Sequence, residues 1–295
     1  MFAGILLSVM ASCVFGVLSY YSVLLLPLNG FGIVAWRVVF TTGMLLLVMS
    51  LGRFWPLFIA QFRSLLQQKH GLLMAIGGTA LLSVQLALFG WAPINGEGQA
   101  LAMGYFLLPL TLVLTGRVIY GERLTPMRRA AVACASVGVL AGLVTTGGFS
   151  LVSLIVMLGY PPYFLLRKRL PLNALNGVFT ENVLLVPVAI LILFYQSFNP
   201  AFFAQHQQGA WLLLCGLGIV SATALLCYMG ASRKLPMVLF GLLGYVEPLL
   251  LFVVALLIGE TMTVQHLWTY IPIWLAVLCL VAEGVRKLLR QQRSG

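Results

Sequence analysis

Long apolar stretches alternate with short polar segments along almost the whole chain. A transmembrane helix needs about 20 predominantly apolar residues, and the pattern predicts ten such helices. They cover about residues 3–26, 30–50, 71–90, 99–117, 128–146, 150–166, 175–196, 210–230, 236–258 and 267–286. The stretch 51–70 is too polar to span, and its pattern predicts a short amphipathic helix at the membrane surface. We therefore expect an all-α multi-pass membrane protein.

Composition supports the same fold class. Of the 295 residues, 61% are hydrophobic and 8% are charged, whereas a soluble domain carries about 25% charged residues. Such a chain needs lipid as much of its solvent. The five cysteines are scattered singly without a CxxC pair, so neither a disulfide framework nor a zinc site is indicated. The N-terminal stretch 1–16 has no basic segment, and we interpret it as the first spanning helix rather than a signal peptide.

The net charge of +11 follows from topology. Every Lys and Arg except Arg37 falls in an alternate loop, at the adjoining helix end or in the C-terminal tail: Arg53, Arg63, Lys69, Arg117, Arg123, Arg128, Arg129, Arg167, Lys168, Arg169, Arg233, Lys234, Arg286, Lys287, Arg290 and Arg293. Basic residues stay in the cytoplasm during insertion. We therefore expect both termini in the cytoplasm, a location in the cytoplasmic (inner) membrane, and no nucleic-acid partner.

Three short motifs recur at nearly one spacing. They are Pro-Leu-Asn at 27–29 and 171–173, Thr-Ala-Leu-Leu at 79–82 and 223–226, and Pro followed by Gly-Glu at 109–122 and 248–260. The repetition predicts a duplicated five-helix unit, with halves at 1–147 and 148–295. Because five is odd, the second half enters the membrane upside down, which gives the inverted repeats of many secondary transporters.

Three charged residues lie inside predicted spans. Arg37 and Glu181 each follow the Asn of a Pro-Leu-Asn motif by eight residues, and Glu247 directly precedes Pro248. A charge at mid-helix costs at least about 2.5–3.5 kcal/mol, so we expect these groups to line a translocation path. A buried carboxyl can exchange protons there because desolvation disfavours its charged form, and Arg37 could hold a carboxylate or phosphate. The alternative is a fixed Arg–Glu pair that locks helices together.

Aromatic residues and prolines extend the set of candidates. Tyr105, Tyr163 and Tyr245 adjoin Gly or Pro, and together with Trp36 and Trp91 they could form the wall of a solute site; for most aromatic residues the alternative is helix packing or an interfacial belt. Pro109 and Pro248 are predicted helix breaks because proline removes a backbone donor. Each Gly-Glu pair at a helix end could cap the helix that follows.

Several chemistries are absent from the sequence. No GxxxxGK[ST] motif for ATP occurs, the three histidines are far apart, and there is no Asp for an intramembrane dyad. A serine nucleophile would need a nearby base, and no histidine is predicted at bilayer depth. We therefore predict that the protein is not an enzyme and has no catalytic residues, metal site or cofactor. No motif specifies an oligomeric state.

Four segments together resemble one family. GWAPINGEGQALAMGYFLLPLTLVLTGRVIYGERL at 90–124, GYVEPLLLFVVALLIGE at 244–260, LGYPPYFLLRKRL at 158–170 and the Trp-Arg pair at 36–37 are similar to the drug/metabolite transporter (DMT) superfamily, EamA branch, and within it to the RarD-like, chloramphenicol-sensitive permeases. The resemblance covers essentially the whole chain.

The resemblance implies ten helices in two inverted halves. It also implies a central cavity formed by helices 1–4 and 6–9, with helices 5 and 10 peripheral, and it assigns the Glu-Pro motif of helix 9 to Glu247 and Pro248. Leu108 departs from the polar Asn that this family often has before the proline of helix 4.

We therefore expect a secondary transporter that exports a small organic metabolite or drug by alternating access, with protons and the lipid bilayer as its other partners. A non-transporting membrane scaffold or sensor is one alternative, and its charges would form static locks. A lipid-carrier flippase is another, and it would require a lateral opening between helices.

Overall fold

The computed structural model describes residues 2–92, 95–146, 150–247, 250 and 264–293. Within these ranges the ordered elements are all helices and no strand occurs. Pro248, which the sequence predicts as a helix break, lies outside the described residues, and so does the Gly-Glu pair at 259–260.

The helices follow the predicted elements closely. They are α1 (Phe2–Leu24), α2 (Gly30–Leu51), α3 (Trp55–Gln67), α4 (Gly71–Trp91), α5 (Gly98–Ile119), α6 (Pro126–Thr146), α7 (Leu151–Arg169), α8 (Ala174–Tyr195), α9 (Pro200–His206), the short 3-10 turn η2 (Gln207–Gly209), α10 (Ala210–Lys234), α11 (Met237–Leu243) and α13 (Val264–Arg293). Helix α3 occupies the stretch that we predicted as a surface amphipathic helix.

Seven of the described helical segments are long and apolar enough to cross a membrane. They are α1, α2, α4, α5, the part of α6 at Pro126–Val144, α8, and the segment Pro200–Lys234 that contains α10. Three basic residues at its end make α7 more polar, and the apolar part of α13 is the shorter segment Ile271–Glu283. The chain is an all-helical, multi-pass membrane protein.

The repeated Pro-Leu-Asn motif starts a helix in both places. The Asn29 side chain accepts a 2.8 Å hydrogen bond from the backbone N–H of Gly32, and the Asn173 side chain accepts a 2.7 Å bond from Asn176. Asn is among the best N-cap residues because its side-chain oxygen satisfies a free amide of the first turn. The motif therefore sets the first residue of α2 and of α8.

Helix α5 continues through Pro109, so the predicted break there is wrong. The second half of α5 crosses α11, and the backbones of the two helices lie very close together there. A Cβ added to Gly241 would lie 2.8 Å from the Leu112 Cβ and 2.9 Å from the Pro109 carbonyl oxygen, and one added to Gly116 would lie 2.9 Å from the Val238 nitrogen. Glycine at these two positions lets the helix backbones approach closely, as small residues do in membrane interfaces.

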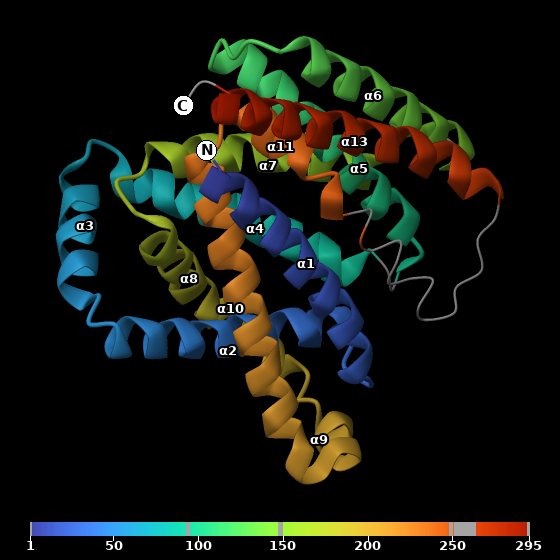
Figure 1. The fold of residues 1–295 in the computed structure, drawn as a ribbon. Helices are drawn as coiled ribbons and strands as arrows, with labels where there is room; N and C mark the ends of the chain where they lie inside the picture. The colour runs from blue at the N-terminus through green and yellow to red at the C-terminus, as the bar shows by residue number, and fades with distance from the viewer. Residues whose placement is uncertain (1, 93–94, 147–149, 248–249, 251–263, 294–295) are drawn as a thin grey trace.

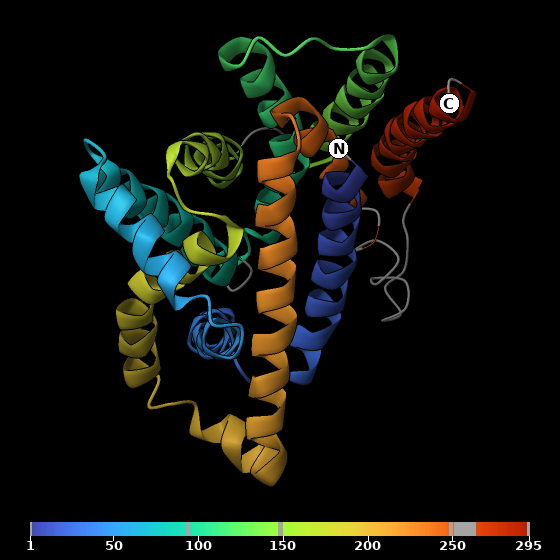
Figure 2. The ribbon, with the colours of Figure 1, turned by 60° about the vertical axis from the view of Figure 1, so that its left-hand side comes forward.

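The helices pack mainly across the midpoint of the sequence. The most extensive pairings among the described helices are α1 with α10, α6 with α13, α2 with α8 and α10, α5 with α7 and α11, and α4 with α7. Figure 1 shows α6 beside α13 at one edge, and Figure 2 shows α1 beside α10. Each pairing joins a helix before residue 147 to one after it.

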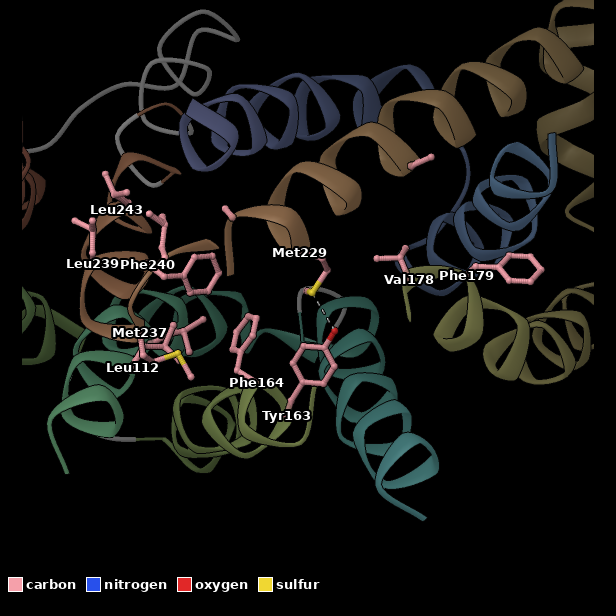
Figure 3. Packing of buried hydrophobic residues seen from close by; sticks show 14 of the residues in the cluster. Leu112, Tyr163, Phe164, Val178, Phe179, Met229, Met237, Leu239, Phe240 and Leu243 are labelled. Atoms are coloured by element: carbon pink, nitrogen blue, oxygen red, sulfur yellow. Dashed lines mark hydrogen bonds between the residues drawn. The ribbon is translucent and has the colours of Figure 1, made fainter. Parts of the chain in front are cut away.

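The largest buried cluster among the described residues extends over α2, α5, α7, α8, α10 and α11 (Figure 3). Phe164, Phe240 and Leu112 are at most 2% exposed, and the Phe164 and Phe240 ring centroids are 5.1 Å apart in an edge-to-face contact. Aromatic pairs in this geometry add about 0.5–1.5 kcal/mol beyond their buried area. The cluster holds the first turns of α11 against the second half of α7.

Candidate functional site

Five polar side chains from five different segments gather inside the helix bundle. They are Arg37 on α2, Tyr105 on α5, Tyr160 on α7, Tyr228 on α10, and Glu247, four residues beyond the end of α11; we call them the central cluster. Protein surrounds all five, yet each retains a partly exposed surface. Arg37 and Glu247 therefore lie close together inside the bundle, and their role in lining a translocation path stays a prediction.

Arg37 and Glu247 lie near each other in the central cluster without direct contact. They are near enough to interact electrostatically, but in the described part of the chain the ion pairs within 4.0 Å are Arg128–Glu283 and Arg167–Glu181. No described residue makes a hydrogen bond to the side chain of either Arg37 or Glu247. The two opposite charges are therefore separate, and neither is neutralised by an ion pair within the described part of the chain.

Tyrosines form the wall of the central cluster. The Tyr105 and Tyr160 hydroxyls are 3.4 Å apart and their ring centroids 6.1 Å apart. The Tyr228 ring lies edge-on to Phe15 of α1, with centroids at 5.7 Å. Such a wall presents apolar ring faces together with hydroxyl groups, so it suits a solute that has both an apolar body and polar groups.

The tyrosines of the central cluster pack against the buried cluster of Figure 3. Tyr160 approaches Tyr163 and Phe164, with centroids at 6.4 and 6.3 Å, and Tyr228 lies 4.9 Å from Phe240. Beyond these rings α7 ends in its three basic residues. Phe164 and Phe240, which Figure 3 labels, thus pack against tyrosines of the central cluster.

Glu181, predicted together with Arg37, belongs to a separate group. Its carboxylate lies 2.8 Å from the Arg167 Nε and accepts bonds of 3.2 and 3.3 Å from the Tyr163 hydroxyl. Tyr163 also contacts the Met229 sulfur at 3.6 Å (Figure 3). Gly177 leaves the space that the Arg167 guanidinium fills. The geometry is that of the fixed Arg–Glu pair that the sequence leaves open as an alternative.

A small cavity adjoins this pair. Its volume is about 10 Å³, and its lining includes Arg167, Glu181, Thr79 and Thr180. That volume is close to the minimum that holds one water molecule. The space is far too small for an organic solute, which separates this pair from the central cluster.

Three predicted residues point elsewhere. Trp36 donates a 3.2 Å hydrogen bond to Asn199 and packs among Phe203 and Trp211, away from Arg37. Tyr245 is fully buried with its hydroxyl on the Phe106 carbonyl oxygen. Trp91 ends α4 and is 40% exposed. A structural role fits the geometry of all three.

Sequence reasoning did not select Arg167, Tyr160 or Glu283. Arg167 looked like a loop cation because it sits in a basic run, and Glu283 lies near the predicted end of the last span, where it pairs with Arg128 at 3.4 Å. Tyr160 adjoins the Pro161-Pro162 pair and was one of many aromatic residues. No local signal in the sequence distinguishes Arg167 from its neighbours in the run Arg167-Lys168-Arg169.

A helical membrane protein that encloses unpaired opposite charges and tyrosines is typical of a membrane transporter. Known proteins with similar sequences belong to the same class. The chain is 45% identical to "Chloramphenicol-sensitive protein RarD" of Pseudomonas aeruginosa, over 99% of this chain and 98% of that one. It is 37% identical to an "Uncharacterized transporter" of Haemophilus influenzae, over 97% and 96% of the two chains. The chain belongs to the RarD family of EamA-type permeases in the drug/metabolite transporter superfamily.

Two further comparisons concern the fold. No protein-family model matches the chain. A solved structure titled "Crystal structure of protein" superposes with a TM-score of 0.64 and 16% identity, over 94% of this chain and 96% of that one. At this identity the match shows a shared fold, which covers nearly the full length of both chains.

Proposed function

We propose that the protein is a secondary-active transporter built from two inverted five-helix repeats, 1–147 and 148–295, with ten spans and both termini in the cytoplasm. The helix pairings support the repeat because equivalent helices of the two halves make equivalent contacts. If α1, α4 and α5 correspond to α7, α10 and α11, the pair α1–α10 corresponds to α7–α4, and the pair α5–α7 corresponds to α11–α1. The equivalent caps of α2 and α8 support it as well. The alternate placement of basic loops supports the orientation and a location in the inner membrane.

The proposed solute is a small organic molecule with an apolar body and charged groups of both signs. The observation that carries this proposal is the separated pair Arg37 and Glu247 between tyrosine walls. An anionic group of the solute binds the guanidinium and a cationic group binds the carboxylate. The ring faces of Tyr105 and Tyr160 pack against the apolar body. The name of the Pseudomonas relative, chloramphenicol-sensitive protein, adds drug-like molecules to the solutes worth testing.

The proposed transport is export coupled to protons, with Glu247 as the proton carrier. Glu247 has no cation within ion-pair distance among the described residues, so its carboxyl is free to exchange a proton for a solute group. Glu181 is the second carboxyl proposed for the path, but its contact with Arg167 favours a structural role. The Arg167–Glu181 pair is the part of the molecule that fits the static lock of a scaffold.

The experiment is a paired binding and transport assay. A panel of amphoteric aromatic solutes and chloramphenicol is screened against purified protein, and each hit is tested in proteoliposomes with an imposed pH gradient. Arg37→Gln and Glu247→Gln are compared with Arg129→Gln, which removes an exposed charge outside the bundle. We expect Arg37→Gln to abolish binding of the amphoteric hits and Glu247→Gln to abolish the response to the pH gradient.

The outcomes separate the parts of the proposal. Transport by Glu247→Gln that still responds to the pH gradient would remove Glu247 as the proton carrier. Binding that is unchanged in Arg37→Gln would remove the guanidinium from the solute site. If no solute in the panel binds and both variants change only thermal stability, the scaffold hypothesis takes the place of transport.

A further inference from the structure

A basic pocket lies outside the central cluster, on the face where the basic loops lie. Its volume is about 370 Å³, and it is lined by the ends of α5, α7 and α10: Ile119, Tyr120, Lys168, Arg169 and Arg233. Pockets of about 300–1,000 Å³ hold small-molecule ligands. Three of the five lining residues are cations. The retention of basic residues in the cytoplasm explains why these loops are basic, but it does not require the cations to gather around one pocket.

The local charges of this pocket do not cancel. Glu122 interacts electrostatically with Lys168, but its single negative charge faces three lining cations, and its carboxylate oxygens accept hydrogen bonds from the backbone N–H groups of Met237 and Val238. One nitrogen of Arg233 is occupied by the carbonyl oxygens of Arg167 and Leu170, at 3.1 and 2.9 Å. The pocket therefore has an excess of positive charge, with one cation held in place by the end of α7.

The remaining donors are available to a ligand. Lys168 makes only a long 3.5 Å contact with the Leu235 carbonyl oxygen and lies 5.2 Å from the centre of the Tyr120 ring. Arg169 is exposed, and no described residue bonds its side chain. Partial burial raises the pKa of the Tyr120 phenol above its ordinary value, so at neutral pH the phenol is a hydrogen-bond donor. Two cations and one hydroxyl match the oxygens of a phosphate group.

The rim of the pocket favours a lipid as the source of that phosphate. Val118 and Ile119, in the last turn of α5, are 71% and 52% exposed, and α5 is one of the membrane-spanning helices. Their apolar side chains lie at the end of the span beside the cations. A phospholipid could place its headgroup on the cations and its acyl chains along α5, and basic pockets between membrane helices bind anionic headgroups in this way.

We propose that the pocket formed by Tyr120, Lys168, Arg169 and Arg233 is a binding site for the headgroup of an anionic phospholipid. The ligand bridges the ends of α5, α7 and α10. Because the Tyr120 end of α5 continues into Glu122, which caps α11, a bound lipid stabilises the arrangement of these four helices on this face. The site is independent of the solute site.

The test is a lipid titration of the purified full-length protein in detergent, followed by native mass spectrometry. Phosphatidylglycerol is compared with phosphatidylcholine of the same acyl chains and with inorganic phosphate. The variant is Lys168→Gln with Arg169→Gln, and the matched control is Arg123→Gln with Arg129→Gln, which removes two exposed charges, one from the loop before α6 and one from the first turn of α6. Arg169→Gln alone is the second variant, because its exposed side chain makes no bond that folding requires.

We expect wild type to bind phosphatidylglycerol over phosphatidylcholine and the pocket variant to bind it about 25-fold more weakly, about fivefold for each charge. The control pair should change the affinity by less than about twofold, and Arg169→Gln alone should lie between. Equal losses in the pocket and control variants would overturn the site in favour of diffuse surface charge. Binding of inorganic phosphate that depends on Lys168 and Arg169, without phosphatidylglycerol binding, would overturn the lipid as its ligand.

Discussion

The Glu122 carboxylate caps a helix that begins at Met237, 115 positions later in the chain. One carboxylate oxygen accepts a 2.7 Å hydrogen bond from the Met237 backbone N–H, and the other a 2.8 Å bond from Val238. The N-cap residue of α11 is Pro236, which offers no side-chain oxygen. Glu122 therefore supplies the missing cap and joins the end of α5 to the start of α11.

The sequence predicts a different partner for Glu122, and that expectation is wrong. It places Glu122 at the start of the next helix, α6. There Thr125 already accepts the bond from the backbone N–H of Arg128, at 3.2 Å. Because α6 has its own cap and α11 has none, the carboxylate is free to serve the helix that crosses α5.

Replacement of Glu122 should measure this cap. Glu122→Ala removes two charge-assisted hydrogen bonds, and we expect the free energy of unfolding to fall by about 1–2 kcal/mol. Thermal unfolding in detergent measures the change. Glu97→Ala is the matched control, because Glu97 stands at the start of α5 without a side-chain cap bond. Equal shifts in the two variants would contradict the role of Glu122 as a cap.

Gly177 should be among the glycines least tolerant of substitution. A Cβ at this position would overlap the Arg167 guanidinium, whose Nε contacts Glu181. We expect Gly177→Ala to lower stability by about 1–3 kcal/mol through overpacking. Gly43→Ala is the control, because an added Cβ there meets no atom within 4 Å. It should be neutral or raise stability by up to about 1 kcal/mol through helix propensity, and a loss as large as that of Gly177→Ala would contradict the explanation.

A double-mutant cycle should identify Arg167 and Glu181 as a structural pair. Removing one partner leaves a buried charge, so Arg167→Met or Glu181→Leu alone should cost about 3–5 kcal/mol. The double variant should recover most of that loss, since both charges are gone. Chemical denaturation of the four proteins measures the coupling, and additive losses would show that the pair is not coupled.

Arg37 should behave differently from Arg167. It has no ion pair among the described residues. Arg37→Met therefore does not deprive any described carboxylate of an ion-pair partner. We expect a change in stability of less than about 1 kcal/mol, measured under the same denaturing conditions. A loss as large as that of Arg167→Met would indicate that Arg37 is a structural cation.

The two Pro-Leu-Asn caps offer a fifth prediction. Asn29→Ala and Asn173→Ala should each lower the free energy of unfolding by about 1 kcal/mol, whereas Asn173→Gly should cost only a few tenths. Asn29 also accepts a 3.0 Å bond from the Gln196 side chain, so Asn29→Ala should be the more costly of the two. Thermal unfolding provides the comparison, and no change in either alanine variant would contradict the capping role.

Local patterns predicted the helices well because helix formation in a membrane depends on runs of apolar residues. The stretches 30–50 and 71–90 coincide with α2 and α4 to within about a residue, and the polar stretch 51–70 contains α3. The region 236–258 was harder, because within it α11 ends at Leu243 and most of the residues that follow lie outside the described ranges.

The partners of the charges depend on contacts that are distant in the sequence. Trp36 and Arg37 are neighbours in the chain, yet the helix turns Trp36 toward Asn199 and Arg37 toward Tyr105 and Tyr160. Adjacent residues on an α-helix face directions about 100° apart, so the residue next to a site residue in the chain does not lie in the same site. Likewise, no local pattern indicates which Glu will lie beside Arg167.

The cross-pairing of helices has a consequence for synthesis. When α1 leaves the ribosome, its main partner α10 has not yet been made, and α4 is complete before α7 exists. The first half must therefore enter the bilayer before its main helix partners exist, with α5 against α6 and α2 against α4 as the contacts that it can already form. The most extensive helix contacts can therefore form only once the second half has been translated, so neither half made alone would have its main partners.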